Sequence, residues 1–165
     1  MPEVITTWFH TAAAGEFLLT MLISMVPVAE LRVGVPAGVA MGLPIPMALL
    51  AGVLGNLLPV PFAILFIRKL FKWVRVHIPR LGSFVDRLER RAYEKIESKN
   101  LLRYEAWGLF LFVAIPLPGT GAWTGSLIAA LMDMRLKSAI PVITLGVVVA
   151  GLIMTALTYG VTTIL

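Results

Sequence analysis

The hydrophobic pattern divides the chain into three long blocks that contain no Asp, Glu, Lys or Arg. They cover residues 33 to 67, 106 to 132 and 138 to 165. Each block is longer than the ~20 apolar residues that a helix needs to cross a hydrocarbon core about 30 Å thick. The pattern therefore predicts an all-α integral membrane protein with three membrane-embedded blocks.

The first block and the apolar run before it do not form a pattern typical of one continuous helix. A proline inside a helix removes a backbone donor and clashes with the preceding turn, and here prolines and glycines recur at short intervals. We expect two short half-helices, at residues 16 to 27 and 37 to 43, that meet at a broken elbow, followed by a full span over residues 46 to 67. The helix breakers are Gly34, Pro36, Gly38, Gly42, Pro44, Pro46, Gly52, Gly55, Pro59 and Pro61.

The second half of the chain follows the same plan. Apolar residues 106 to 115 precede the string P-L-P-G-T-G at residues 116 to 121, and apolar residues then continue to 132. A second full span is expected over residues 138 to 159. A shift of 91 residues pairs Pro27 with Pro118, Gly34 with Gly125, Met41 with Met132, Ala48 with Ala139, Leu54 with Leu145 and Gly55 with Gly146. Some identities are expected between any two apolar segments, so these matches indicate an internal repeat without establishing one.

The net charge of +5 comes mainly from one loop. Eleven of the 14 Lys and Arg residues lie between Arg68 and Glu105. Such a concentration is typical of a cytoplasmic loop, so it favours a multi-pass protein of the inner (cytoplasmic) membrane over a nucleic-acid-binding protein. Within the loop, apolar residues recur at helical spacing over residues 81 to 96. We expect an amphipathic helix there, either on the anionic inner leaflet or packed as a connector.

The charges after the second broken segment test whether that segment crosses the membrane. If residues 106 to 132 crossed fully, Arg135 and Lys137 would lie outside, whereas a segment that enters and returns keeps both inside. The positive-inside rule therefore favours two oppositely oriented halves, each a re-entrant broken-helix hairpin plus one transmembrane helix. Four conventional spans with both termini inside remain the alternative. The predicted parts of this single membrane domain are residues 1–67, the amphipathic cytoplasmic connector 68–105 and residues 106–165.

Glu30 and Arg32 are the most informative residues, because they are the only charges between Glu16 and Arg68. Ionisable groups at membrane depth cost several kcal/mol, and they usually pair, face a cavity or mark a substrate or proton route. We assign proton binding or cation recognition to Glu30 and anion recognition to Arg32. The alternative is that both side chains reach the interface from a shallow hairpin.

The second elbow offers polar groups but no charge. Irregular backbone at membrane depth is tolerated where it is buried in protein or lines a watery cavity. The elbow could hold a polar ligand group, or its prolines and glycines could only form the turn while its threonines bond their own helix. The candidate substrate-binding residues are Pro116, Pro118, Gly119, Thr120, Gly121, Trp123 and Thr124.

Asn56 is a further candidate, since it is an amide inside a predicted full span. It should have a hydrogen-bond partner, in another helix or in a substrate, because desolvation without one is unfavourable. The chain has no cysteine, and its two histidines, His10 and His77, are far apart. We therefore expect no metal site and no cofactor, and no motif points to an enzyme.

Three strings carry a family resemblance: P-V-A-E-L-R-V-G-V-P-A-G-V-A-M-G, G-N-L-L-P-V and P-L-P-G-T-G-A-W-T-G-S-L-I-A-A-L-M-D-M. Over residues 20 to 155 the chain resembles the prokaryotic family of small multidrug export proteins, which implies export. It is also distantly similar to the DedA superfamily, which implies paired re-entrant hairpins and translocation of lipids such as undecaprenyl phosphate. Where the DedA pattern places arginines near the second turn, this chain has Val113 and Gly119. Arg32 would then have to supply the cation, with Thr120 and backbone amides helping.

We therefore predict a small transporter or lipid translocase for an amphiphile, either a drug or an undecaprenyl-phosphate-like lipid. It would work by alternating access around the two elbows, with proton coupling through Glu30. The alternative is a membrane scaffold or assembly factor that transports nothing. The expected partners are membrane lipids, the substrate and further copies of the chain, because two complete spans bury little surface around a site.

Overall fold

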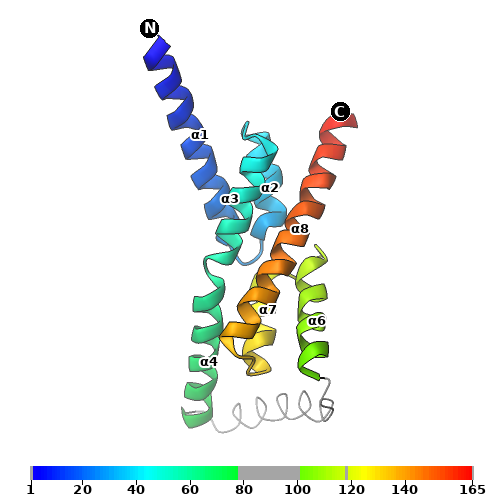
Figure 1. Cartoon of the computed structure of the whole chain (residues 1–165). Coiled ribbons are helices and arrows are strands. Elements are labelled where there is room, and N and C mark those ends of the chain that lie inside the picture. Colours follow the sequence, from blue (N-terminus) through cyan, green and yellow to red (C-terminus); the bar gives the residue numbers. More distant parts are fainter. Residues whose placement is uncertain (1, 78–100, 118, 165) are drawn as a thin grey trace. The chain divides into compact units, whose positions relative to one another are not determined.

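The computed structural model describes residues 2–77, 101–117 and 119–164, which form helices joined by turns, with no strand among them (Figure 1). This confirms the all-helical prediction. The amphipathic helix expected over residues 81 to 96 lies outside the described residues. The helices are α1 (Pro2–Met25), α2 (Glu30–Ala40), α3 (Ile45–Leu57), α4 (Val60–His77), α6 (Leu101–Ala114), α7 (Ala122–Leu131) and α8 (Leu136–Ile164).

Among the described residues, two stretches are long and apolar enough to cross a membrane, and they coincide with the two predicted full spans. They are Ile45–Val74 and Leu136–Gly160. The first is divided into α3 and α4 at Pro59, which cannot donate a backbone hydrogen bond to the preceding turn. Helix α4 also continues past the predicted end at residue 67. The charged residues that begin there mark the end of the apolar stretch, but they do not end a helix.

The first broken segment differs from the prediction in where its second helix begins. Helix α2 starts at Glu30 instead of residue 37, so Pro36 lies inside it. An internal proline costs a helix about 3 kcal/mol. Helix α2 packs against both α1 and α3, and burial of Leu31 and Val35 offsets that cost.

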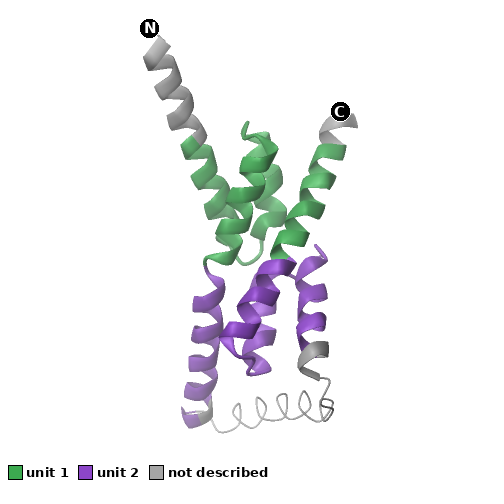
Figure 2. Cartoon of the chain, viewed as in Figure 1, with its two compact units in different colours: residues 1–58, 147–165 green, residues 59–146 purple. Residues whose placement is uncertain are grey.

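The described chain forms two compact units (Figure 2). Unit 1 comprises residues 1–58 and 147–165, and unit 2 comprises residues 59–146. In unit 1, α1, α2 and α3 pack against one another. In unit 2, α7 packs against both α4 and α6.

Glycines allow the helices of each unit to approach closely. In unit 1, a Cβ atom on Gly34 would overlap the Ser24 hydroxyl, and one on Gly55 would overlap the Met21 carbonyl. In unit 2, a Cβ atom on Gly125 or Gly146 would lie only 2.6 or 2.7 Å from Val113. The glycines paired by the 91-residue shift therefore lie at close helix contacts.

The turn after α2 and the turn after α7 have the same backbone hydrogen bonds. Each is a Schellman motif, in which a residue with positive φ ends the helix and two amides bond back to its last turn. That residue is Gly42 in one turn, with φ 101°, and Asp133 in the other, with φ 47°. In the first turn, the N–H groups of Met41, Gly42 and Leu43 donate to the carbonyls of Ala37, Val39 and Gly38. In the second, those of Met132, Asp133 and Met134 donate to Ile128, Ala130 and Ala129, each 91 residues later.

The correspondence continues into the next helix. Met47 and Ala48 donate to the Pro44 carbonyl, and Ser138 and Ala139 donate to the Arg135 carbonyl. The offset is again 91 residues for every atom pair. The identities found in the sequence therefore coincide with a repeated backbone structure.

Candidate functional site

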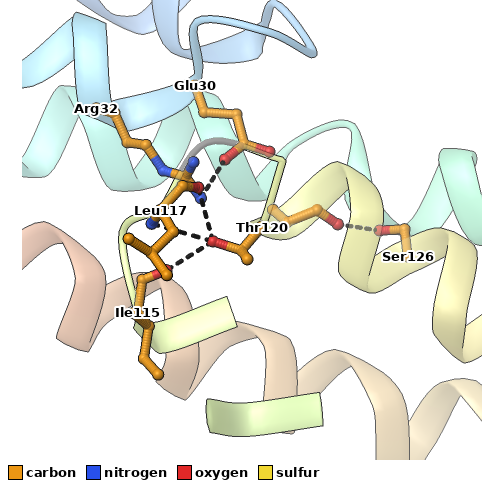
Figure 3. Close-up of polar contacts among 7 residues, drawn as sticks. Glu30, Arg32, Ile115, Leu117, Thr120 and Ser126 are labelled. Carbon is orange, nitrogen blue, oxygen red and sulfur yellow. Dashed lines mark hydrogen bonds and ion pairs between the residues drawn. The ribbon is translucent and has the colours of Figure 1, made fainter. Parts of the chain in front are cut away.

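Glu30 and Arg32 lie together on the first turn of α2, in unit 1 (Figure 3). The distance from Arg32 Nη2 to Glu30 Oε2 is 3.8 Å, and their side chains are 15% and 5% exposed. The sequence predicted both residues in a broken elbow, whereas the structure places them inside a helix. Both side chains are largely buried all the same.

Glu30 has a φ of 50°, in the left-handed region that residues other than glycine rarely adopt. Helix α1 ends at Met25, and the Glu30 N–H donates to the Val26 carbonyl at 2.9 Å, which closes the connecting turn. The left-handed conformation costs about 1–2 kcal/mol. Strained backbone of this kind concentrates at functional sites, and it identifies Glu30 as a candidate.

Thr120 closes the second elbow on itself, in unit 2 (Figure 3). Its hydroxyl lies 2.6 Å from the Ile115 carbonyl and 2.8 Å from the Leu117 carbonyl, and it accepts a bond from the Leu117 N–H at 3.2 Å. The turn after α6 is thus held by a side chain as well as by backbone. These contacts match the alternative in which a threonine serves its own segment.

The glycines of this elbow make the turn geometrically feasible. Gly119 and Gly121 have φ values of 83° and 134°. Gly121 is also the N-cap of α7, and its carbonyl accepts from the Gly125 N–H at 2.7 Å. Among the other candidates, Pro116 lies in the turn before α7, Trp123 and Thr124 lie in the first turn of α7, and Pro118 lies outside the described residues.

Asn56 lies on α3 in unit 1 and is 1% exposed. Its Oδ1 atom has no hydrogen-bond partner among the described residues. Two buried hydroxyls of α1, which packs against α3, donate within their own helix. Thr20 Oγ1 donates to the Glu16 carbonyl and Ser24 Oγ to the Thr20 carbonyl, both at 2.8 Å. A buried acceptor without a donor costs about 1–3 kcal/mol.

The structure also shows polar groups that the sequence analysis did not select. Thr20, Ser24 and Ser126 are fully buried. The spacing of four between Thr20 and Ser24 was the available signal, because it puts both hydroxyls on one helix face. The Ser126 hydroxyl bonds the Ala122 carbonyl at 2.6 Å (Figure 3).

Arg68 is a second such residue. The sequence placed it at the start of the basic loop, but it lies within α4, where its Nη2 donates to the Met134 carbonyl. The same nitrogen is 3.7 Å from Asp133 Oδ1, so Arg68 joins α4 to the turn after α7 within unit 2. Among the residues that the structure describes, no three His, Cys, Asp or Glu side chains gather in a way that could hold a metal ion.

The candidate residues thus fall into two groups. Glu30, Arg32 and Asn56 belong to unit 1, and the described residues of the second elbow belong to unit 2. No curated protein and no solved structure matches the chain. One family model matches residues 30–153, a segment that includes all the candidate residues. Since the match covers most of the 165 residues, the chain belongs to the family described as "Putative small multi-drug export protein".

Proposed function

We propose that this membrane protein moves amphiphilic molecules across the cytoplasmic membrane, and that Glu30 and Arg32 recognise the charged part of the substrate. The observation that carries the proposal is the buried ion pair, at 3.8 Å with side chains 5% and 15% exposed. Two opposite charges withdrawn from water gain little stability from each other, since desolvation offsets much of their attraction. Function is therefore the better reason for the pair, and membership of an export family agrees with it.

The chemistry of the pair favours an anionic head group. Arg offers a planar fork of donors that matches the oxygens of a phosphate, and it stays charged when partly desolvated. Glu30 competes with that anion for Arg32. Proton uptake by Glu30 would remove the competing charge, so it would couple proton binding to capture of a phosphate-bearing lipid.

The proposed topology follows from the repeated turns. Two segments with the same backbone hydrogen bonds, 91 residues apart, support two halves of similar structure. We propose that the halves are inverted, with re-entrant hairpins formed by α1–α2 and α6–α7. The distant likeness to the DedA superfamily, the homo-oligomeric state and the absence of enzymatic activity and of nucleic-acid partners stay predictions.

Transport by reconstituted protein tests the proposal. In proteoliposomes, Arg32→Lys should reduce flux and binding of a phosphate-bearing lipid about tenfold or more, because the ammonium loses the bidentate geometry. Glu30→Gln should leave that flux independent of pH between 5 and 8, while the wild type varies. Arg135→Lys, an exposed Arg outside the apolar stretch, is the matched control and should change neither property.

Two outcomes would count against this function. Unchanged affinity for phosphate lipid in Arg32→Ala, together with loss of cationic drug uptake in Glu30→Gln, would reverse the substrate preference. An absence of flux for both substrate classes in folded wild-type protein would favour the scaffold instead. A lipid and drug screen by thermal unfolding adds an independent readout, because a ligand that binds only the folded state must raise its stability.

A further inference from the structure

Unit 1 buries several oxygen atoms where α1, α2 and α3 pack together. Thr20 and Ser24 are fully buried, Asn56 is 1% exposed and Glu30 is 4% exposed. The Asn56 Oδ1 atom has no hydrogen-bond partner among the described residues. A buried acceptor of this kind indicates a missing donor or cation.

Helix register places Asn56 beside the turn between α1 and α2. A Cβ atom on Gly38 would lie 3.1 Å from Ala48, and one on Gly52 would lie 2.7 Å from Val35 and 3.5 Å from Leu31. As α3 advances by one turn, its contact on α2 therefore moves back toward the start of that helix. One further turn along the same face of α3 brings Asn56 to the level of the turn between α1 and α2, which Glu30 follows as the first residue of α2.

Ser24 approaches this position from α1. Its Oγ atom would lie 3.6 Å from a Cβ atom on Gly52, one turn before Asn56. Its hydrogen is donated to the Thr20 carbonyl, so the lone pairs of Oγ remain to face the other helices. Helix α1 ends at Met25, and the carbonyl end of a helix carries partial negative charge.

These groups together offer acceptors and negative charge. They are an amide oxygen, a hydroxyl whose proton is already donated, a helix C-terminus and the Glu30 carboxylate, which also pairs with Arg32 at 3.8 Å. Hard cations prefer such oxygen ligands. Broken helices in membrane transporters bind sodium through the same combination of helix ends, carbonyls and side-chain oxygens.

Close packing limits the size of the ligand. A Cβ atom on Gly34 would overlap Ser24 Oγ, and one on Gly55 would overlap the Met21 carbonyl. Helices that leave no room for a methyl group at these points leave none for an organic ammonium. Among monovalent cations, a bare alkali-metal ion needs the least space.

We propose that Asn56 Oδ1 and Ser24 Oγ are ligands of a sodium ion, with Glu30 as the nearby negative charge. Binding of the ion stands by itself, and only its role as a coupling ion rests on the proposed export function. The site would then be sensitive to both protons and sodium, because both act on Glu30.

Thermal unfolding of the full chain in detergent tests sodium binding. At constant ionic strength, replacing choline by sodium should raise the Tm of the wild type progressively, since the ion binds the folded state. Asn56→Val should abolish this rise and should also raise the Tm in sodium-free buffer, because it removes a buried acceptor without a donor. Valine is a suitable replacement because Val147, 91 residues later, is fully buried at the corresponding position.

Three further variants guard against misfolding as an explanation. Asn56→Asp adds a charge at unchanged size and should tighten sodium binding about tenfold or more. Ser24→Ala should weaken the sodium response, whereas Ser126→Ala should leave it intact. Ser126 is the matched control because it is equally buried and bonds its own helix in the same way, but lies in unit 2.

An unchanged wild-type Tm between choline and sodium, or an equal sodium response in Asn56→Val, would overturn the proposal. Failure here is distinguishable from failure of the export function. Lipid flux without any sodium effect on Tm or flux would remove only the sodium site. A sodium-dependent Tm that Asn56→Val abolishes, in a protein that moves neither substrate class, would remove only export.

Discussion

At the scale of single residues, Glu30 combines burial, charge and an unfavourable backbone conformation. Its φ of 50° is imposed by the turn that joins α1 to α2, and its side chain is only 5% exposed. A residue that served the turn alone would be glycine, which adopts this conformation without a steric penalty. The carboxylate is therefore retained against a cost in stability.

This cost can be measured with two substitutions that remove the same carboxylate. Glu30→Gly should give a folded protein about 1 kcal/mol more stable than Glu30→Ala, because only alanine keeps the Cβ atom that disfavours positive φ. Chemical denaturation in detergent would report the difference. Equal stability of the two variants would show that the backbone at Glu30 is not strained. Both variants should lose the pH dependence of transport.

At the scale of helices, the glycines set the distances between neighbours. Gly55 on α3 is in contact with the backbone of Met21 on α1, so a methyl group there has no flexible neighbour to displace. Separation of the two helices would expose Ala51, which is buried one turn before Gly55 on α3.

Gly55→Ala should accordingly destabilise the protein by about 2 kcal/mol or more, as overpacking in a tight core does. Gly108→Ala on α6 is the matched control, since a Cβ atom there would meet no described heavy atom within 4 Å. That variant should gain up to about 1 kcal/mol from the better helix propensity of alanine. Thermal unfolding of both variants checks the contrast, and a similar Tm for the two would contradict the packing inferred for Gly55.

The same elements show what the sequence could predict. The second elbow was predicted at residues 116 to 121, between α6 and α7, because prolines and glycines there separate two uninterrupted apolar runs. The start of α2 was predicted wrongly because Pro36 was taken as a boundary, although packing on two sides keeps it inside the helix.

For the candidate site, charge was the decisive signal. Glu30 and Arg32 stand out because they interrupt an apolar segment. Thr20 and Ser24 do not, since hydroxyl residues are common in membrane helices, where they bond the preceding turn. The unpartnered Oδ1 atom of Asn56 could not be predicted, because no sequence pattern tells which acceptor a buried hydroxyl bonds.

At the scale of the whole molecule, the proposed inversion makes a prediction about the two equivalent turns. Pro44 and Arg135 hold the same place in the repeated hydrogen-bond pattern, and both are exposed. If the halves are inverted, the two positions lie on opposite sides of the membrane. If the chain makes four conventional spans with both termini inside, both positions lie outside.

Single cysteines at these positions decide between the topologies, and the chain has no cysteine of its own to interfere. An impermeant maleimide should label Pro44→Cys from outside intact cells and Arg135→Cys only in inverted vesicles. Lys137→Cys, two residues further along, should behave like Arg135→Cys. Labelling of Arg135→Cys from outside only would overturn the inverted arrangement.

The constant offset of 91 residues between the two Schellman turns has a further consequence. The stretch from Ala37 to Ala48 aligns with residues 128–139 without an insertion or a deletion. This is expected of a tandem duplication whose copies kept their length. A duplicated frame allows one copy to specialise while the other preserves the architecture. In the 91-residue alignment Asn56 corresponds to Val147, and Gly42 corresponds to Asp133. Such unequal pairs hold equivalent positions in the 91-residue alignment and differ in side-chain chemistry.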